Sequence, residues 1–377
     1  IVTNRDKQSA FLTEIQQSKV TPIEPVFVDY QKDMTQFDVR EGIHVLYKKN
    51  ELNDIFTLNY IFDTGTENDP SLSLAFDYMS YLGTEAMSAE QIASEMYDIA
   101  CSFSMYAGSN QCSISISGLS ENMPRAMEIV EGLISGAVAD EEILENLKQD
   151  MIKERADAKL NQARNFGALQ RYLYYGEDYI KRTTLTNDAL AALGSEQLIT
   201  AVQALMGKQH EVLYYGPKSE EEVKQLIAEN HKAADELAPL EKNYPKKQLT
   251  DQSSDILAQY DANQLYYLQF SNRGEAFDVK NDPAITLYNE YFGGSMNSIC
   301  FQEMREARGL AYTAQAWLAS PSFAGDSYSY TAFIATQNDK MQTAIEAFDE
   351  IINQMPESEA AFQIAKEALI SRLRTER

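Results

Sequence analysis

Cysteine and histidine are both scarce in this sequence, with three of each among 377 residues. The cysteines are odd in number and scattered, at Cys101, Cys112 and Cys300, so they match neither a disulfide framework nor a CxxC metal site. The histidines are His44, His210 and His231. They form no His-x-x-x-His pair, which argues against a zinc site on one helix. Each is interpreted as an ordinary surface or packed histidine.

Basic residues and long apolar runs are also lacking. Lysine and arginine total 32 against 57 aspartates and glutamates, which gives a formal charge of −25. A surface this negative repels nucleic-acid phosphates and anionic lipid headgroups, so neither is an expected partner. No apolar run of about 18 residues occurs, and no membrane span is expected. The acidic surface favours basic or neutral partners, although a solvated exterior that prevents aggregation is the simpler explanation.

The length suits two domains of roughly 150–200 residues each. The content of 44% hydrophobic and 24% charged residues is typical of a folded globular protein. Ile1 is not a start methionine, so we expect this chain to have been cut from a longer one, with any signal peptide upstream.

An internal repeat organises the chain. The tripeptide Asn-Asp-Pro occurs at 68–70 and again at 281–283, an offset of 213 residues (281 − 68). Each copy follows an alternating, strand-like run and opens a helix, with Asp as N-cap and Pro at the first helical position. These helices are predicted to end at Gly83 and Gly293 because glycine is the common residue just past a helix. Gly293 and Gly294 are accordingly interpreted as a helix end and turn, not as a substrate-binding loop.

The parallel continues after these helices, with a second helix, two strands and two amphipathic helices in each copy. The matching segments are strands over 54–63, 102–108 and 112–118 with helices over 122–135 and 140–160, and strands over 263–271, 310–320 and 327–336 with helices over 338–352 and 357–377. Such order and spacing predict two copies of one folding unit. We therefore predict an α+β fold with two homologous units, each a mainly antiparallel β-sheet covered by helices.

The repeat also sets the expected domain boundaries. Residues 36–217 form the first unit, which ends on a strand at 210–217. Residues 251–377 form the second unit, which is C-terminally incomplete because the same offset places the counterpart of that strand beyond Arg377. The charged stretch 218–250 is predicted to be a linker, and residues 1–35 a connector.

The helix at 72–83, LSLAFDYMSYLG, has two distinct faces. Apolar side chains at helical spacing are expected in the core, and they are Leu72, Ala75, Phe76, Met79 and Leu82. Leu74, Asp77, Tyr78 and Tyr81 share a neighbouring face, where positions i, i+3 and i+4 can meet. With histidine at 74 and 78 and glutamate at 77, this would be the zinc motif H-x-x-E-H, in which two imidazoles hold the metal and the carboxylate activates water.

The frame LAFDYMSYLGT, preceded by FDTGTENDP, resembles the active-site segment of the insulinase/pitrilysin family of zinc metallopeptidases. That segment reads approximately H-x-x-E-H-M-x-x-x-G-T. The resemblance places Leu74 and Tyr78 at the histidine positions and Asp77 at the catalytic glutamate. The family's third ligand, a glutamate, corresponds to Glu154, 76 residues after Tyr78 (154 − 78). Leucine does not ligate zinc and tyrosine rarely does, so we expect a degenerate site without metal and an exposed carboxylate at Glu154.

The second unit carries a more specific segment, YFGGSMNSICFQEMREARGLAYTAQAW at 291–317, similar to a segment in the C-terminal half of the family. In two-half members, that half contributes an arginine and a tyrosine, seven positions apart, that contact substrate at the distant metal site. Arg305 and Tyr312 have this spacing (312 − 305), whereas Arg308 does not. A phenol O–H aimed at the scissile carbonyl oxygen is worth roughly 3 kcal/mol in the transition state, and a guanidinium can hold a backbone carbonyl. The alternative is a solvated helix arginine and a half-buried strand tyrosine.

The resemblance covers most of residues 40–377 and implies that this chain is the non-catalytic half, usually the C-terminal one, of a zinc-dependent endopeptidase. In the family, two halves close around a chamber that admits peptides or unfolded segments. This half would form part of the chamber wall and supply Arg305 and Tyr312. Zinc and the catalytic base would lie in a catalytic partner half, upstream in the same polypeptide, with residues 1–35 as the end of the connector. The chain alone is expected to bind no zinc and to cleave nothing.

The sequence is also compatible with two other functions. The family includes inactive scaffolding members, such as core subunits of a respiratory complex, and an upstream H-x-x-E-H would distinguish an enzyme from such a scaffold. A generic acidic two-domain binding protein is the third possibility. Peptide-scavenging members of the family point to an extracytoplasmic location such as the periplasm, which nothing in the residues themselves shows.

Overall fold

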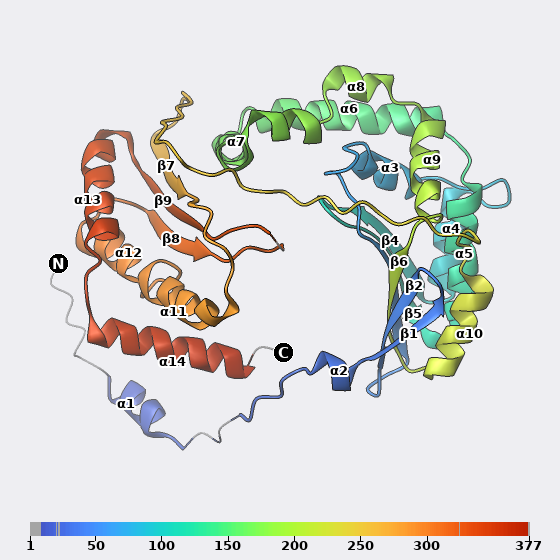
Figure 1. The fold of residues 1–377 in the computed structure, drawn as a ribbon, viewed down its shortest axis with the longest axis horizontal. Helices are drawn as coiled ribbons and strands as arrows, with labels where there is room; N and C mark the ends of the chain where they lie inside the picture. The colour runs from blue at the N-terminus through green and yellow to red at the C-terminus, as the bar shows by residue number, and fades with distance from the viewer. Residues whose placement is uncertain (1–8, 20, 22, 324, 376–377) are drawn as a thin grey trace.

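The structure, a computed structural model, describes residues 9–19, 21, 23–323 and 325–375. Two units follow one another along the chain, each with a β-sheet and helices packed on it (Figure 1). The predicted α+β fold of mainly antiparallel sheets covered by helices is confirmed. Parts of the expected connector, residues 1–8, 20 and 22, lie outside the described residues.

The first unit is built on a six-stranded sheet with the strand order β1-β2-β6-β3-β5-β4. Neighbouring strands are antiparallel, except β2 and β6, which run parallel. The last strand of the first unit, β6, therefore lies inside the sheet, so this sheet is complete only once residues 210–216 have paired. The strands are β1 Thr35–Arg40, β2 Ile43–Lys49, β3 Ile55–Phe62, β4 Cys101–Ala107, β5 Cys112–Leu119 and β6 His210–Gly216.

Helices cover one face of this sheet (Figure 1). Alternate residues of β3, from Phe56 to Phe62, are fully buried beneath α3, α5 and α9 and form the first core, as expected for strands with one apolar face. Side-chain caps begin several helices, such as the capping box of Ser88 and Gln91 at α4. The helices are α1 Ala10–Gln17, α2 Tyr30–Asp33, α3 Leu72–Met79, α4 Ala89–Asp98, α5 Met123–Gly136, α6 Glu141–Ala158, α7 Gln162–Thr183, α8 Asn187–Ala192, α9 Ser195–Leu205 and α10 Glu220–Asn230. None of the helices in the described ranges is both long and apolar enough to cross a membrane.

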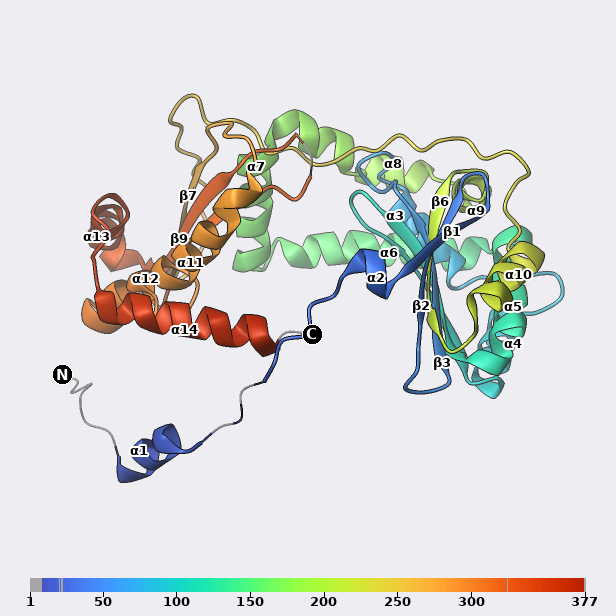
Figure 2. The ribbon, with the colours of Figure 1, turned by 60° about the horizontal axis from the view of Figure 1, so that its bottom comes forward.

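The opposite face of the first sheet carries many polar side chains beside apolar ones such as Ile61 and Tyr106, and we call it the serine-rich face. Its polar side chains alternate with the buried ones along β3, β4 and β5, and they are Thr57, Asn59, Ser102, Ser104, Ser113, Ser115 and Ser117. Across this face the hydroxyl oxygen atoms of Ser102 and Ser117 lie 3.2 Å apart. The serine-rich face turns toward the side of the molecule on which the second unit lies (Figures 1 and 2).

The second unit repeats part of this design with a three-stranded antiparallel sheet in the order β7-β9-β8. The same order and directions occur in β3-β5-β4 of the first unit. Within the described residues, β7 has a strand on one side only, whereas β3 lies between β5 and β6. The elements are β7 Gln264–Ser271, α11 Asp282–Phe292, α12 Ile299–Phe301, β8 Thr313–Ala319, β9 Ser329–Gln337, α13 Met341–Asn353 and α14 Glu359–Thr375.

One face of the second sheet is covered by α7, a helix that precedes the linker. Phe166 of α7 packs its ring 5.3 Å from the ring of Tyr266 and 5.6 Å from that of Phe333. Tyr174 lies 4.7 Å from the ring of Phe270. A kink at Gly176, where φ is 82° and ψ is 175°, separates this first half of α7 from its last turns. The first half of α7 thus packs on the second unit, although the helix precedes the linker in sequence.

The first unit extends further along the chain than the expected boundary at residue 217. Val223 and Ile227 of α10 are buried in the first core, and Leu237 packs against that core from the stretch that follows. The expected linker 218–250 thus contains a packed helix, because the apolar positions of α10 recur at helical spacing amid a strongly acidic sequence. The segment without a helix or strand runs from 231 to 263.

The two Asn-Asp-Pro tripeptides do not act as the expected aspartate N-caps. Asp69 accepts hydrogen bonds from the backbone and hydroxyl of Ser71, so α3 begins later than predicted. Asp282 is itself the first residue of α11, and its carboxylate accepts a hydrogen bond from the Ser320 hydroxyl. A carboxylate that finds a partner in a neighbouring turn is no longer available to the helix amides.

Gly293 follows α11 as predicted, whereas α3 ends at Met79, well before Gly83. A Cβ atom built on Gly293 would lie 1.8 Å from the carbonyl oxygen of Ala316 in β8. The close approach of the β8 backbone therefore excludes any side chain there, and the glycine is required for packing as much as for ending a helix.

Three buried ionisable side chains form a hydrogen-bonded chain in the first core. Nδ1 of His231 lies 2.6 Å from a carboxylate oxygen of Glu131 in α5, and both side chains are almost fully buried. Nε2 of His231 lies 2.8 Å from Nε2 of His210, whose Nδ1 lies 2.7 Å from the carbonyl oxygen of Lys208. Because a carbonyl only accepts, the hydrogen of His210 sits on Nδ1, and its Nε2 accepts from His231. The sequence interpretation of two separate, ordinary histidines missed this pairing.

Gly293→Ala is expected to destabilise the second unit by about 1–3 kcal/mol, because the added methyl group overlaps backbone atoms that cannot rotate away. Urea unfolding followed by the fluorescence of Trp317, the single tryptophan, reports on β8 directly. Gly132→Ala in α5, where a Cβ meets nothing within 4 Å, is the control and should leave the Trp317 transition unchanged. A Gly293→Ala protein as stable as wild type would contradict the steric argument.

Burial lowers the pKa of His210 to about 4. The unfolded chain, with an ordinary histidine pKa near 6.5, then binds the proton first, so stability falls as pH drops from about 6.5 to about 4, by on the order of 3 kcal/mol. In His210→Asn this slope should be reduced, whatever the stability at pH 7. The exposed His44, paired with Asp38, supplies the control variant His44→Asn. The measurement is the unfolding free energy against pH, and equal slopes in all three proteins would disprove the assignment.

Candidate functional site

The helix that corresponds to a zinc-binding segment, α3, is buried on nearly all sides. Leu74 is 1% exposed and Tyr78 is 0% exposed, as are most of the other residues of the helix. The sequence placed Leu74 and Tyr78 on a face beside the core, but the structure places them inside it. A helix that is apolar almost all round is packed on all sides, so only Asp77, Ser80 and Tyr81 remain exposed along it.

The polar atoms of this helix are committed to other contacts. The hydroxyl of Tyr78 donates to the carbonyl oxygen of Asp140 at 3.0 Å and accepts from the amide of Asp140 at 2.8 Å. Tyr78 thus fixes the residue that caps α6. Asp77 lies at the surface, and partial burial of its carboxyl raises its pKa above the ordinary value. It has no neighbouring ligand with which to activate water.

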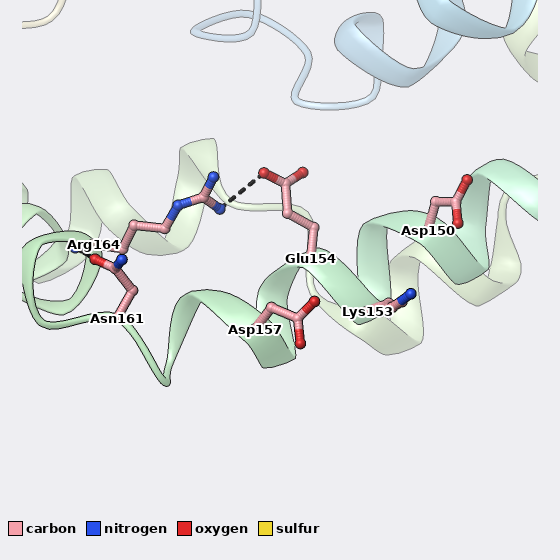
Figure 3. A pocket seen from close by; sticks show the side chains of 6 residues that line it. All are labelled: Asp150, Lys153, Glu154, Asp157, Asn161 and Arg164. Carbon is pink, nitrogen blue, oxygen red and sulfur yellow. Dashed lines mark hydrogen bonds and ion pairs between the residues drawn. The ribbon is translucent and has the colours of Figure 1, made fainter.

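Glu154, at the position of the third ligand, lies on the exposed side of α6 (Figure 3). Its carboxylate pairs with Nη1 of Arg164 at 2.9 Å, and the two line an open pocket of about 380 Å³ at the corner between α6 and α7. Leu74 has no donor atom, Tyr78 uses its hydroxyl on Asp140, and Glu154 is neutralised by arginine. These residues therefore do not fit zinc, and no group of three or more His, Cys, Asp or Glu side chains in the described chain is placed to hold a metal ion.

Arg305 lies in an unusual stretch of helix. The three-residue α12 continues into a π-helical turn over Gln302–Ala307, a widened form often found at functional positions. Gly309, with φ of 59°, then reverses the chain into β8, and Tyr312 directly precedes that strand. The turn is closed by hydrogen bonds from the amides of Arg308 and Leu310 to the carbonyls of Glu303 and Met304.

The structure brings Arg305 and Tyr312 into direct contact. The guanidinium carbon of Arg305 lies 4.7 Å from the ring centre of Tyr312 and 4.9 Å from that of Phe301. We call this arrangement of Phe301, Arg305 and Tyr312 the arginine sandwich. Cation–π contacts of this kind hold a guanidinium plane in place at an exposed site. Nη1 of Arg305 also makes a long contact of 3.5 Å with the carbonyl oxygen of Tyr312.

The polar ends of this pair are open to solvent. Tyr312 is 68% exposed, and its hydroxyl makes no hydrogen bond to any described residue. The Arg305 side chain is 38% exposed, with Glu306 as a distant ion-pair partner at 3.6 Å. A phenol donor and a guanidinium side by side, both accessible, can bind a carbonyl oxygen or a carboxylate. Tyr312 is thus more exposed than a half-buried strand residue would be.

Arg308, the competing arginine, is engaged elsewhere. Its guanidinium pairs with Glu350 of α13 at 3.0 Å and with Glu303 at 3.6 Å, and the bond to Glu350 raises the pKa of the guanidinium. Arg308 therefore ties the π-helical turn to α13. Sequence reasoning missed the part played by Phe301, although its position four residues before Arg305 is the spacing at which side chains meet on a helix.

Comparisons with known proteins find a family model and relatives for this chain. Residues 207–369 match the family model of the peptidase M16 inactive domain. The chain is 23% identical over 333 residues to an uncharacterized zinc protease of Rickettsia felis, an alignment that covers 85% of this chain and 77% of that protein.

Two solved structures share the fold. One is a peptidase M16 inactive domain from Pseudomonas fluorescens, with a TM-score of 0.69, 18% identity and coverage of 89% of this chain and 83% of that one. The other is the periplasmic protease PqqL from Escherichia coli, with a TM-score of 0.74, 14% identity and coverage of 99% of this chain but 42% of that one.

Leu74, Tyr78 and Glu154 do not fit zinc, and residues 207–369, from β6 of the first unit into α14, match a domain described as inactive. The chain thus resembles the insulinase/pitrilysin-type (M16) zinc peptidases, and its residues 207–369 match the inactive domain of that family.

Proposed function

We propose that this chain is the non-catalytic half of a zinc-dependent endopeptidase, in which Arg305 and Tyr312 contact the scissile peptide. The observation that carries this proposal is the arginine sandwich, which holds a guanidinium beside an exposed phenol with a free hydroxyl. Such a pair is suited to a carbonyl oxygen that becomes negative in the transition state, because both groups are donors fixed before the substrate arrives.

The serine-rich face supports the second part of the proposal, a wall of a substrate chamber. It presents hydroxyl and amide groups toward the side where the second unit lies (Figure 1). Hydroxyl and amide groups of this kind can form hydrogen bonds with the backbone of an extended segment. The net charge of −25 adds a preference for neutral or basic peptides.

Zinc and the catalytic base belong, in this proposal, to a partner half upstream in the same polypeptide. The alignment with less than half of PqqL supports such a division. Within this chain, Arg305 and Tyr312 would bind and orient the peptide, and the buried α3 would be purely structural. A scaffold function is the competing outcome of the experiments below.

Tyr312→Phe, made in a polypeptide that includes the catalytic half, is expected to lower kcat about 100-fold with little change in KM, because only the donor hydroxyl is lost while the ring over Arg305 remains. Hydrolysis of a fluorogenic peptide in the presence of zinc measures this. Tyr97→Phe, at a highly exposed tyrosine of α4, is the matched control and should behave as wild type.

Equal kcat values for Tyr312→Phe and Tyr97→Phe would remove Tyr312 from the active site. A polypeptide that cleaves no peptide with zinc supplied would favour the scaffold function instead.

Arg305→Lys is expected to raise KM about tenfold, since an ammonium keeps the charge but loses the planar stacking between two rings and the paired donors of the guanidinium. Steady-state kinetics with the same peptide test this change. Arg308→Lys, at the arginine that binds Glu350, is the control and should leave KM unchanged. A larger effect at Arg308 than at Arg305 would mean that the spacing argument chose the wrong arginine.

A further inference from the structure

Helix α7 contacts the second sheet before Gly176 and the first unit after it. Before the kink, the carbonyl of Gln264 accepts from the Gln162 side chain at 2.6 Å, and the hydroxyl oxygens of Tyr174 and Thr331 lie 3.2 Å apart. Together with the ring contacts of Phe166, these tie the first half of α7 to the second sheet. After the kink, Arg182 and Tyr179 both bind Glu67 of the first unit. One helix is thus divided between two bodies.

The backbone at the dividing point is one that only glycine adopts readily. Gly176 has φ of 82° and ψ of 175°, a region essentially closed to residues with a Cβ atom. The carbonyls that the kink frees are satisfied by one linker residue, Gln248. Its amide N–H donates to Tyr174 at 2.7 Å and its side chain donates to Leu173 at 2.6 Å.

The linker also switches its contacts from the first unit to the second within a few residues. Up to Lys242, which pairs with Asp63, it is bound to the first unit. From Tyr244, whose ring stacks on Phe323 at 4.4 Å, it is bound to the second unit. Asn243 between them makes no hydrogen bond to the described residues. The chain therefore crosses between the two bodies here through a single residue.

Another crossing is the corner between α6 and α7, which holds an open pocket. The open pocket of about 380 Å³ separates the two helices there, spanned by the exposed pair Glu154–Arg164 (Figure 3). The Asn165 side chain makes local hydrogen bonds to the carbonyls of residues 158, 159 and 161, and the hydroxyl of Tyr260 donates to the carbonyl oxygen of Leu160 at 2.6 Å. An exposed ion pair of this kind adds little rigidity.

We propose that Gly176 is the pivot of a hinge inside this half. The second unit and the first half of α7 move as one body against the first unit, on thin connections at the α6–α7 corner, Gly176 and Asn243. The N-terminal segment is a further crossing, because Thr21 and Ile23 line a pocket with α14 and the chain then runs on to β1. Arg171 restrains the angle seen here, because it donates to the hydroxyl of Thr183 at 2.9 Å and lies over the ring of Tyr179 across the kink. Arg305 and Tyr312 belong to the moving body. The hinge angle therefore determines the distance between this pair and the serine-rich face. The consequence for Arg305 and Tyr312 rests on the proposed function, but the movement does not.

Distances between paired spin labels test this on the whole chain. The native cysteines are all buried, and burial raises the thiol pKa of Cys112 and of Cys300 to about 12, so labels attach selectively to cysteines introduced at exposed positions. Tyr97→Cys with Lys366→Cys measures across the hinge, from α4 to α14. Ala168→Cys with Lys366→Cys measures within the proposed moving body, from α7 to α14.

The wild-type protein should show a broader distance distribution for the 97–366 pair than for the 168–366 pair. Gly176→Ala should shift the 97–366 mean by roughly 5 Å or more, the scale of one helical turn, and leave the 168–366 pair unchanged. Gly167→Ala, in the same helix where a Cβ meets nothing within 4 Å, is the control and should change neither pair.

Equally narrow distributions for both pairs, or a 168–366 distance that shifts together with the 97–366 distance, would overturn the hinge. If Gly176→Ala does not fold, Gln248→Ala replaces it. Loss of the two hydrogen bonds that brace the kink should broaden the 97–366 distribution alone, and an unchanged distribution would count against the proposal. Because the readout is a distance, it does not depend on whether the protein takes part in proteolysis.

Discussion

The packing of α7 on the second sheet is the contact on which the arrangement of this chain depends. Each face of a three-stranded sheet must either be covered by other apolar groups or carry polar side chains that water can solvate. Here one face carries the aromatic side chains Tyr266, Phe270 and Phe333 and therefore needs a cover. The helices of the second unit lie on the other side, so α7 covers this face. That requirement draws the first half of α7 away from the unit in which the helix ends, and the kink at Gly176 follows from it.

The two units have kept different parts of a shared design. In the first unit α3, which the sequence resemblance compares with a zinc-binding helix, lies in the core, with Leu74 packed and the Tyr78 hydroxyl bound to the backbone of Asp140. Restoring histidines there would place imidazoles in a space filled by apolar neighbours, without room for a metal and its water. In the second unit the helix before β8 has stayed at the surface, and its widened turn holds Arg305 between two rings.

Several features followed from local patterns. Alternating residues predicted β3, β5 and β9, and the family resemblance singled out Arg305 and Tyr312, which the structure places in contact. Other features had no local signal. Glu131, His210 and His231 meet in one buried chain although they come from α5, β6 and the end of α10. The alternation of the strands also could not reveal that β6 lies at the centre of its sheet, because pairing order depends on contacts far apart in sequence.

The sequence by itself determined the repeated order of strands and helices, and its resemblance to a peptidase family singled out Leu74, Tyr78, Arg305 and Tyr312. These depend on residue type and spacing, which act within one or two turns of the chain. Only the tertiary structure decided that α3 is buried on nearly all sides, that α10 belongs to the first core, and that α7 is shared between units. Each of these depends on which apolar surface remains uncovered after the sheets have formed, and that surface exists only once distant segments have come together.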